Sequence, residues 1–183
     1  SQVMLQAQAE HGMISAWCPE GLSQIQCQPY IYDILKPYFK ISKDCGFDGG
    51  CFANSKVLLI DGTYYNASTG GINYGSTRDH WSTFILQDGI SVLLQYTPSV
   101  VGIYVGIYVD VDNFKGSNTY GKDVFIFHAT DDKVVPEGMR TEAKGDALSA
   151  YCGRYCAAWV LANENMDYLH CNDLSWNGKT KCK

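Results

Sequence analysis

The stretch FILQDGISVLL, residues 84–94, decides the fold class of this 183-residue chain. Two apolar segments, Phe84–Gln87 and Ile90–Leu94, flank the pair Asp88-Gly89. An Asp-Gly pair readily supplies the two positive φ values of a type I′ turn, so the stretch predicts a β-hairpin. We therefore expect an antiparallel sheet in the middle of the chain.

Further strand-like segments surround this hairpin and place the expected sheet within residues 57–128. Val57–Ile60, Val101–Val111 and Val124–Phe127 are rich in β-branched and aromatic residues, which suit strands. The polar segment Thr130–Ala147 is predicted to be a loop. The apolar run Ala157–Leu161 is ambiguous between helix and strand, and we interpret it as a final strand.

Helical periodicity marks the N-terminal part of the chain. Ser1 to about Trp17 contains no proline, and its apolar residues follow one helical stripe. A second short helix is expected over Tyr30–Phe39, with Pro37 weakening its last turn. Helices followed by a run of strands indicate an α+β fold, and the length suggests one domain over residues 1–183.

The charge balance argues against nucleic acid as a partner. The formal net charge is −5, whereas phosphate binding needs clustered Lys and Arg. The chain also has no signal peptide and no apolar run of about 18 residues. We expect it to be the mature or truncated form of an exported protein whose targeting segment has been removed.

The cysteines indicate an oxidising compartment. Their number is even, and they do not form the paired CxxC array of a zinc ribbon, so we interpret them as disulfides. The eight residues are Cys18, Cys27, Cys45, Cys51, Cys152, Cys156, Cys171 and Cys182. Short loops favour Cys18–Cys27, Cys45–Cys51 and Cys171–Cys182, which leaves Cys152 with Cys156 by elimination. A crossed pair such as Cys156–Cys171 remains open.

The C-terminal third carries the most specific motif, CAAWVLANENMDYL at Cys156–Leu169, followed by Cys171 and by Leu174–Cys182. Together with Tyr38–Cys45, the Asp88-Gly89 hairpin and Val109–Phe125, this motif resembles bacterial pilin-like proteins. These are the type IV pilins and type II secretion pseudopilins that carry a prepilin-type N-terminal cleavage/methylation segment.

The resemblance implies a long N-terminal helix whose apolar first half spans the inner membrane before assembly. Its second half, residues 1–17 here, would pack on the antiparallel sheet, and a disulfide-bonded region over 152–183 would follow the sheet. We therefore expect a structural subunit of a type IV pilus or type II secretion pseudopilus in the bacterial cell envelope. Its partners would be other subunits of the filament, and we do not expect an enzyme. The alternative is a surface adhesin or minor pilin that binds a glycan or host protein through its loops.

The segment between Val109 and Val124 contains the candidate metal site. Oxygen-bearing side chains gather there beside two glycines, and calcium takes six to eight oxygen ligands from a flexible loop. The candidate ligands are Asp110, Asp112, Asn113, Asn118 and Asp123. Some pseudopilins bind calcium in a β-loop, whereas the alternative is a connection in which these side chains cap backbone amides. No other cofactor is expected.

A polar cluster at Asn163–Tyr168 lies between Trp159 and Trp176 in the sequence. Aromatic rings beside amides and carboxylates suit sugar recognition, but we favour a core role for Trp159 and Tyr168. His170 and Cys171 form the one imaginable nucleophile pair. Adjacent residues point apart, and a disulfide would consume the thiol.

Overall fold

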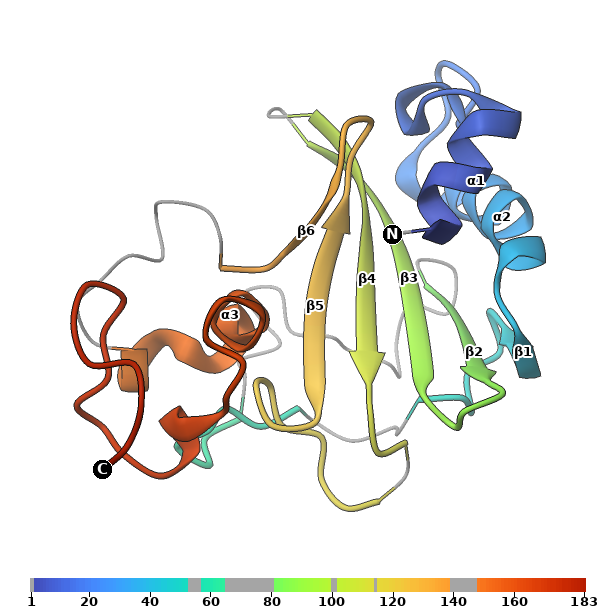
Figure 1. Cartoon of the computed structure of the whole chain (residues 1–183). Coiled ribbons are helices and arrows are strands. Elements are labelled where there is room, and N and C mark those ends of the chain that lie inside the picture. The colour runs from blue at the N-terminus through green and yellow to red at the C-terminus, as the bar shows by residue number, and fades with distance from the viewer. Residues whose placement is uncertain (1, 53–56, 65–80, 100–101, 114, 139–147) are drawn as a thin grey trace.

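A six-stranded antiparallel sheet forms the centre of the computed structural model, which describes residues 2–52, 57–64, 81–99, 102–113, 115–138 and 148–183 (Figure 1). Each strand pairs with the next strand in the sequence, so the sheet is a meander in the order β1-β2-β3-β4-β5-β6. The strands are β1 (Ile41–Gly46), β2 (Ser82–Leu86), β3 (Ser91–Ser99), β4 (Gly102–Asp110), β5 (Val124–Ala129) and β6 (Val134–Pro136). The predicted α+β class is confirmed.

Helices lie at the two lateral edges of this sheet (Figure 1). At one edge the chain forms α1 (Gln2–His11), the 3₁₀ turn η1 (Ile14–Ala16), α2 (Gln24–Leu35) and the 3₁₀ turn η2 (Lys36–Tyr38). Of these, α2 contacts β2 and β3, η1 contacts β4, and α1 packs against α2 and η2. Near β5 and β6, the chain forms α3 (Leu148–Asn163), and the 3₁₀ turn η6 (Asp167–Leu169) follows α3. The sheet thus separates an N-terminal from a C-terminal lobe.

The predicted hairpin is confirmed, but its turn is not type I′. Strands β2 and β3 pair through Phe84 opposite Val92. Of the Asp-Gly pair only Gly89 has a positive φ, 90°, whereas type I′ needs two. The Gly89 amide donates to the Leu86 carbonyl at 3.0 Å. The connection is therefore a longer loop in which glycine takes the left-handed position.

The prediction of one continuous helix over residues 1–17 is wrong beyond His11. Gly12 has a φ of 78°, and its amide donates to the Gln8 carbonyl at 2.9 Å. A left-handed glycine at this position ends a helix. The chain then turns back, and Ile14 and Trp17 are buried in the same core cluster as Leu94 and Val105 of the sheet.

The second predicted helix begins earlier than residue 30. Ser23 caps the first turn of α2, and Gln26 completes a capping box with it. The expected weakening at Pro37 is confirmed, because the last residues form the 3₁₀ turn η2. The helix buries Ile31 and Leu35 against the sheet.

Three other strand predictions need correction. Ala157–Leu161 is helical, because it lies within α3 rather than in a final strand. Residues 57–60 form only isolated bridges, through Leu58 to Tyr64 and Thr119. The sheet exceeds the predicted range 57–128, since β1 precedes it and β6 lies within the segment 130–147 that was expected to be a loop.

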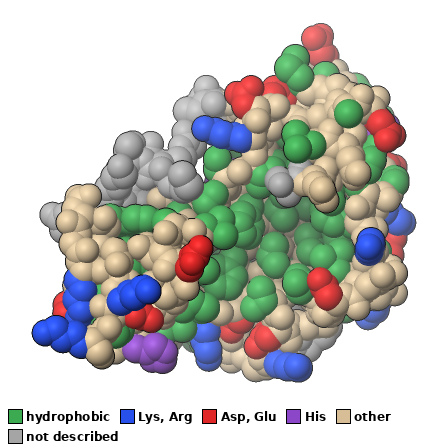
Figure 2. All heavy atoms as spheres, viewed as in Figure 1, with side chains coloured by type: hydrophobic (Ala, Val, Ile, Leu, Met, Phe, Trp, Pro, Cys, Tyr) green, Lys and Arg blue, Asp and Glu red, His purple; other side chains and the backbone are tan. Residues whose placement is uncertain are grey.

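The two faces of the sheet are covered to different extents. On the face that carries α1 and α2, Val92 and Leu94 are buried. The cross-strand pairs Val109–Phe125 and Ile107–Phe127 continue this face across β4 and β5. These four side chains, here named the apolar strip, are only partly buried. Figure 2 shows hydrophobic side chains gathered in a hollow over the sheet, between the two lobes.

Candidate functional site

The acidic turn, residues Asp110–Asp123, connects β4 to β5 at one end of the sheet (Figure 1). Asp110 pairs across the sheet with Ser91 on one side and with Val124 on the other. Strand alternation puts Asp110 on the face opposite to the apolar strip, together with buried Tyr108. The register of the sheet therefore directs a carboxylate inward.

Backbone and side-chain hydrogen bonds fix the shape of the acidic turn. The Val111 amide donates to the Asp123 carbonyl at 3.0 Å, and Asp123 Oδ1 accepts from the Thr119 amide. Asn113 takes a left-handed φ of 61°, and its Oδ1 accepts from the Ser91 hydroxyl at 2.9 Å. These bonds match the capping role that was the alternative to metal binding.

Burial makes the carboxyl groups of this turn hold their protons more strongly. Burial, with repulsion from Asp112 and Asp123, raises the pKa of Asp110 to about 7. Burial, with repulsion from Asp112, also raises the pKa of Asp123. Asp110 Oδ1 accepts from the Asp112 amide at 3.2 Å, whereas the buried atoms Asp110 Oδ2 and Asp112 Oδ1 have no hydrogen-bond partner.

The structure brings part of the predicted ligand set together. Asp110, Asp112 and Asp123 lie close enough to influence one another electrostatically. Asn118 is buried, and its Nδ2 has no partner. In the part of the chain that is described, no three Asp, Glu, His or Cys side chains converge closely enough to hold a metal. Calcium binding by this turn stays a prediction.

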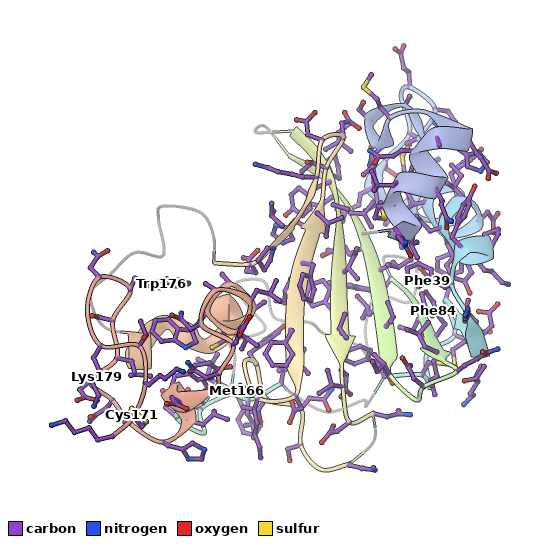
Figure 3. The ribbon with its side chains drawn as sticks, viewed as in Figure 1. Phe39, Phe84, Met166, Cys171, Trp176 and Lys179 are labelled. Atoms are coloured by element: carbon purple, nitrogen blue, oxygen red, sulfur yellow. A yellow bond between two sulfur atoms is a disulfide. The ribbon has the colours of Figure 1, made fainter. Side chains whose placement is uncertain are left out.

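The C-terminal polar cluster serves the core of its own lobe. Trp159 is buried in α3, and its Nε1 donates to Asn165 Oδ1 at 3.2 Å. Asn165 Nδ2 donates to the carbonyls of Asn163 and Thr180. Trp176 packs edge-on against Trp159, with ring centroids 5.1 Å apart, and Figure 3 shows it in this lobe with Met166, Cys171 and Lys179.

Tyr168 links this lobe to the acidic turn. Its buried hydroxyl donates to the Gly121 carbonyl at 2.6 Å. The core role predicted for Trp159 and Tyr168 is thus confirmed, and the sugar pocket has no support from these two side chains. Burial raises the pKa of Tyr168, which keeps the hydroxyl protonated as a donor.

Three of the predicted disulfides are present. They are Cys18–Cys27, Cys45–Cys51 and Cys171–Cys182. The crossed pair Cys156–Cys171 is excluded, because Cys171 bonds to Cys182. Cys156 is itself disulfide-bonded, and Cys152 lies in α3 but its side chain is not among those that the structure describes, so the predicted pair Cys152–Cys156 stays a prediction. Because its sulfur is in a disulfide, Cys171 has no thiol to act as a nucleophile with His170.

Sequence reasoning missed the apolar strip. Its signal was present, since β4 carries Ile103, Val105, Ile107 and Val109 at alternate positions and Tyr104 and Tyr108 between them. Large side chains at both odd and even positions, and therefore on both faces, are typical of a strand that is covered on both faces. The sequence therefore called for a second covering layer over β4.

Comparisons of the chain with protein-family models, with curated proteins and with solved structures each find no match. Among the described residues, no helix combines the length and the apolar character that crossing a membrane requires. The features from which a function can be inferred are therefore the fold, the apolar strip, the acidic turn and the disulfides.

Proposed function

We propose that this protein is a structural subunit of a type IV pilus or type II secretion pseudopilus in the bacterial cell envelope. In this proposal α1 is the end of a longer helix, which anchors the subunit in the inner membrane before assembly and bundles with other subunits in the filament. The role is structural rather than catalytic. The observation that carries the proposal is the apolar strip, which lies on the same sheet face as the core cluster that contains Met4 and Ala7 of α1.

The apolar strip needs a cover that the described elements do not complete. Val109 and Phe125 face each other across β4 and β5, as do Ile107 and Phe127. Fully burying a side chain of this size stabilises by about 1.5–3 kcal/mol relative to full exposure. A helix laid along these four partly buried side chains would recover part of that energy.

The position of α1 supports such a helix. Met4 and Ala7 are buried in the core cluster of this sheet face. A groove of about 580 Å³ begins at the first turn of α1 and extends to the β2–β3 turn. It is lined by Gln2, Val3, Gln6, Tyr38, Phe39, Lys40, Leu86, Gln87 and Asp88. A helix that precedes Gln2 would run beside this groove and over the sheet face.

The disulfides support a location outside the cytoplasm. Each described pair closes a short loop, with sequence separations of 9, 6 and 11 residues. Disulfides persist in oxidising compartments, and removing one from a small secreted domain typically costs about 2–5 kcal/mol. Cross-linked lobes on both sides of the sheet suit a subunit head exposed to the environment.

The test uses the complete gene product, expressed from its own start codon in bacteria that carry the cognate assembly machinery. Phe125→Ser combined with Val109→Ser should abolish filaments in sheared-surface fractions and in electron micrographs. Leu161→Ser is the matched control, because Leu161 is an apolar residue of α3 that is 61% exposed and belongs to no core cluster. The isolated heads of both variants should retain cooperative melting.

Two outcomes would contradict the proposal. One is normal filament assembly by the strip variant at normal protein level. The other is a gene in which no apolar stretch of about 20 residues precedes the codon for Ser1.

A further inference from the structure

The three described disulfides share one pattern, because each joins a cysteine to the next cysteine along the chain. No other cysteine lies between the two members of any of these pairs. The pairs are Cys18–Cys27, Cys45–Cys51 and Cys171–Cys182, with sequence separations of 9, 6 and 11 residues. Eight cysteines allow about 100 different connectivities, so pairing between neighbours is a specific result.

Each of these disulfides also stays within one local part of the fold. The first joins the segment before α2 to α2 itself, the second closes the turn at the end of β1, and the third closes the segment that follows η6. None of the three pairs connects the N-terminal lobe to the C-terminal lobe. The loops can therefore close before the two lobes pack against the sheet.

Loop length favours these pairs over the long-range alternatives in an unfolded chain. The probability that two cysteines meet decreases with about the 3/2 power of the length of the loop between them. Cys45 should therefore meet Cys51 about 5-fold more often than it meets Cys27. Cys51 should in turn meet Cys45 about 70-fold more often than it meets Cys152. The observed pairs are thus the kinetically preferred products.

Burial places the oxidation step before the final packing of the fold. The Cys27 side chain is 1% exposed, and that of Cys51 is 0% exposed. Cys27 belongs to the core cluster that also contains Ile31 and Leu94. Thiol–disulfide exchange requires a thiolate to reach and attack a disulfide sulfur, so a packed core would keep an oxidant away from these sulfurs. The pairs must therefore form while α2 is still accessible.

We propose that a dithiol oxidase forms these pairs on the unfolded chain, and that the chain needs no disulfide isomerase. In each reaction one cysteine thiolate attacks the disulfide of the oxidised catalyst, which gives a mixed disulfide and releases one catalyst thiol. The neighbouring cysteine thiolate then attacks the mixed disulfide, closes the pair and releases the second catalyst thiol. Two electrons and two protons thus pass from the chain to the catalyst. The proposal requires an oxidising compartment, but it does not depend on the filament role.

The first test oxidises the reduced protein in strong denaturant with oxidised glutathione, and maps the pairs by mass spectrometry of proteolytic peptides. The three pairs should be the main products of their cysteines, far above the share of about 1% that random pairing gives to one connectivity. After removal of the denaturant, this material should melt at the Tm of protein that was never reduced. Pairing at the random level, or failure to regain that Tm, would overturn the proposal.

The second test dilutes the reduced chain from denaturant into an oxidised dithiol oxidase of the thioredoxin fold, with and without protein disulfide isomerase. The oxidase should accelerate pairing by more than about 10-fold over air alone. The isomerase should leave the yield of the three pairs unchanged, because no wrong pairs need to be exchanged. An oxidase without effect, or a several-fold higher yield with isomerase, would overturn the proposal.

Cys18→Ser combined with Cys27→Ser is the matched variant, because it removes one complete pair and leaves the other cysteines with their neighbours. Cys45–Cys51 and Cys171–Cys182 should form in denaturant with the yields of the parent, and this measurement does not require the variant to fold. The loss of either pair would show that the disulfides form through the tertiary structure, which would equally overturn the proposal.

Discussion

Replacing Gln28 by methionine tests whether α2 substitutes for a missing neighbour of β3. The pairing of β2 with β3 ends at Ser82 opposite Leu94. Beyond this point the side chain of Gln28 supplies the hydrogen bonds that a neighbouring strand would make. Its Nε2 donates to the Leu94 carbonyl at 2.9 Å, and its Oε1 accepts the Tyr96 amide at 2.6 Å. The side chain is 0% exposed, so no water can replace it.

The expected loss follows from these two bonds. Methionine has a similar length but no hydrogen-bonding amide, so the substitution leaves the Tyr96 N–H and the Leu94 carbonyl short of a partner. A buried polar group that loses its partner costs about 1–3 kcal/mol, which gives about 2–6 kcal/mol for the two groups together. The free energy of unfolding should fall by this amount in urea titrations with the disulfides intact, at an unchanged m value.

Gln24→Met is the control for this experiment. Gln24 Nε2 donates to the Tyr96 carbonyl at 2.6 Å, but Gln24 is only partly buried, so water can replace the bond. Its loss should cost below about 1 kcal/mol. A change of less than about 0.5 kcal/mol in the free energy of unfolding of Gln28→Met would contradict this role of Gln28. Equal destabilisation of both variants would contradict it as well.

Two further predictions concern the end of β4. The pKa of Asp110, about 7, exceeds its ordinary value of 3.8, so the native state binds more protons than the unfolded chain between about pH 4 and 7. Its stability should therefore decrease as pH rises through this window, by about 2–4 kcal/mol, and Asp110→Asn should remove this slope in pH-dependent urea titrations. Tyr168→Phe removes the donor to Gly121 and should cost about 1–2 kcal/mol, whereas Tyr30→Phe, at an exposed position of α2, should cost almost nothing. An equal cost for the two tyrosine variants, or an unchanged pH slope in Asp110→Asn, would contradict these assignments.

Short sequence motifs correctly predicted those parts of the fold that depend on residues close together in the chain. Asp88-Gly89 between two apolar segments located the hairpin, and short loops located three disulfides. The turn type was wrong because the flanking residues allow a longer loop, in which Gly89 alone needs a positive φ. Gly12 was a readable helix stop, but apolar residues after it extended the helical pattern past the true end.

The misassigned strand shows where such signals fail. Cys156, Ala157, Ala158 and Trp159 are consecutive and all buried, although they lie in a helix. A helix covered on several sides has no apolar stripe, and a short apolar run then looks like a buried strand. Only the tertiary packing of the C-terminal lobe, in which Trp159 meets Trp176, decides between the two structures.

The sequence located the oxygen-bearing residues of the acidic turn, but it did not show which of their side chains are buried. The sequence placed five oxygen-bearing side chains in one segment, but it could not tell which of them turn inward. That selection comes from the register of β4, because Asp110 opposite Ser91 and Val124 must share their face of the sheet. A shift of one residue would move Asp110 to the partly covered face of the apolar strip.

The same register explains why one face of β4 buries a carboxylate, whereas the other face carries partly buried apolar side chains. On one face the acidic turn and residues 57–60 close over Tyr108 and Asp110, so that face needs a counter-charge. On the other face, which carries the core cluster of α1 and α2, Ile107 and Val109 remain only partly buried, so that face needs apolar cover. A helix that continues α1 along the strip would supply the cover and leave the acidic turn untouched. Strip variants should therefore affect assembly without changing the pH dependence of stability that Asp110 confers, and Asp110→Asn should do the reverse.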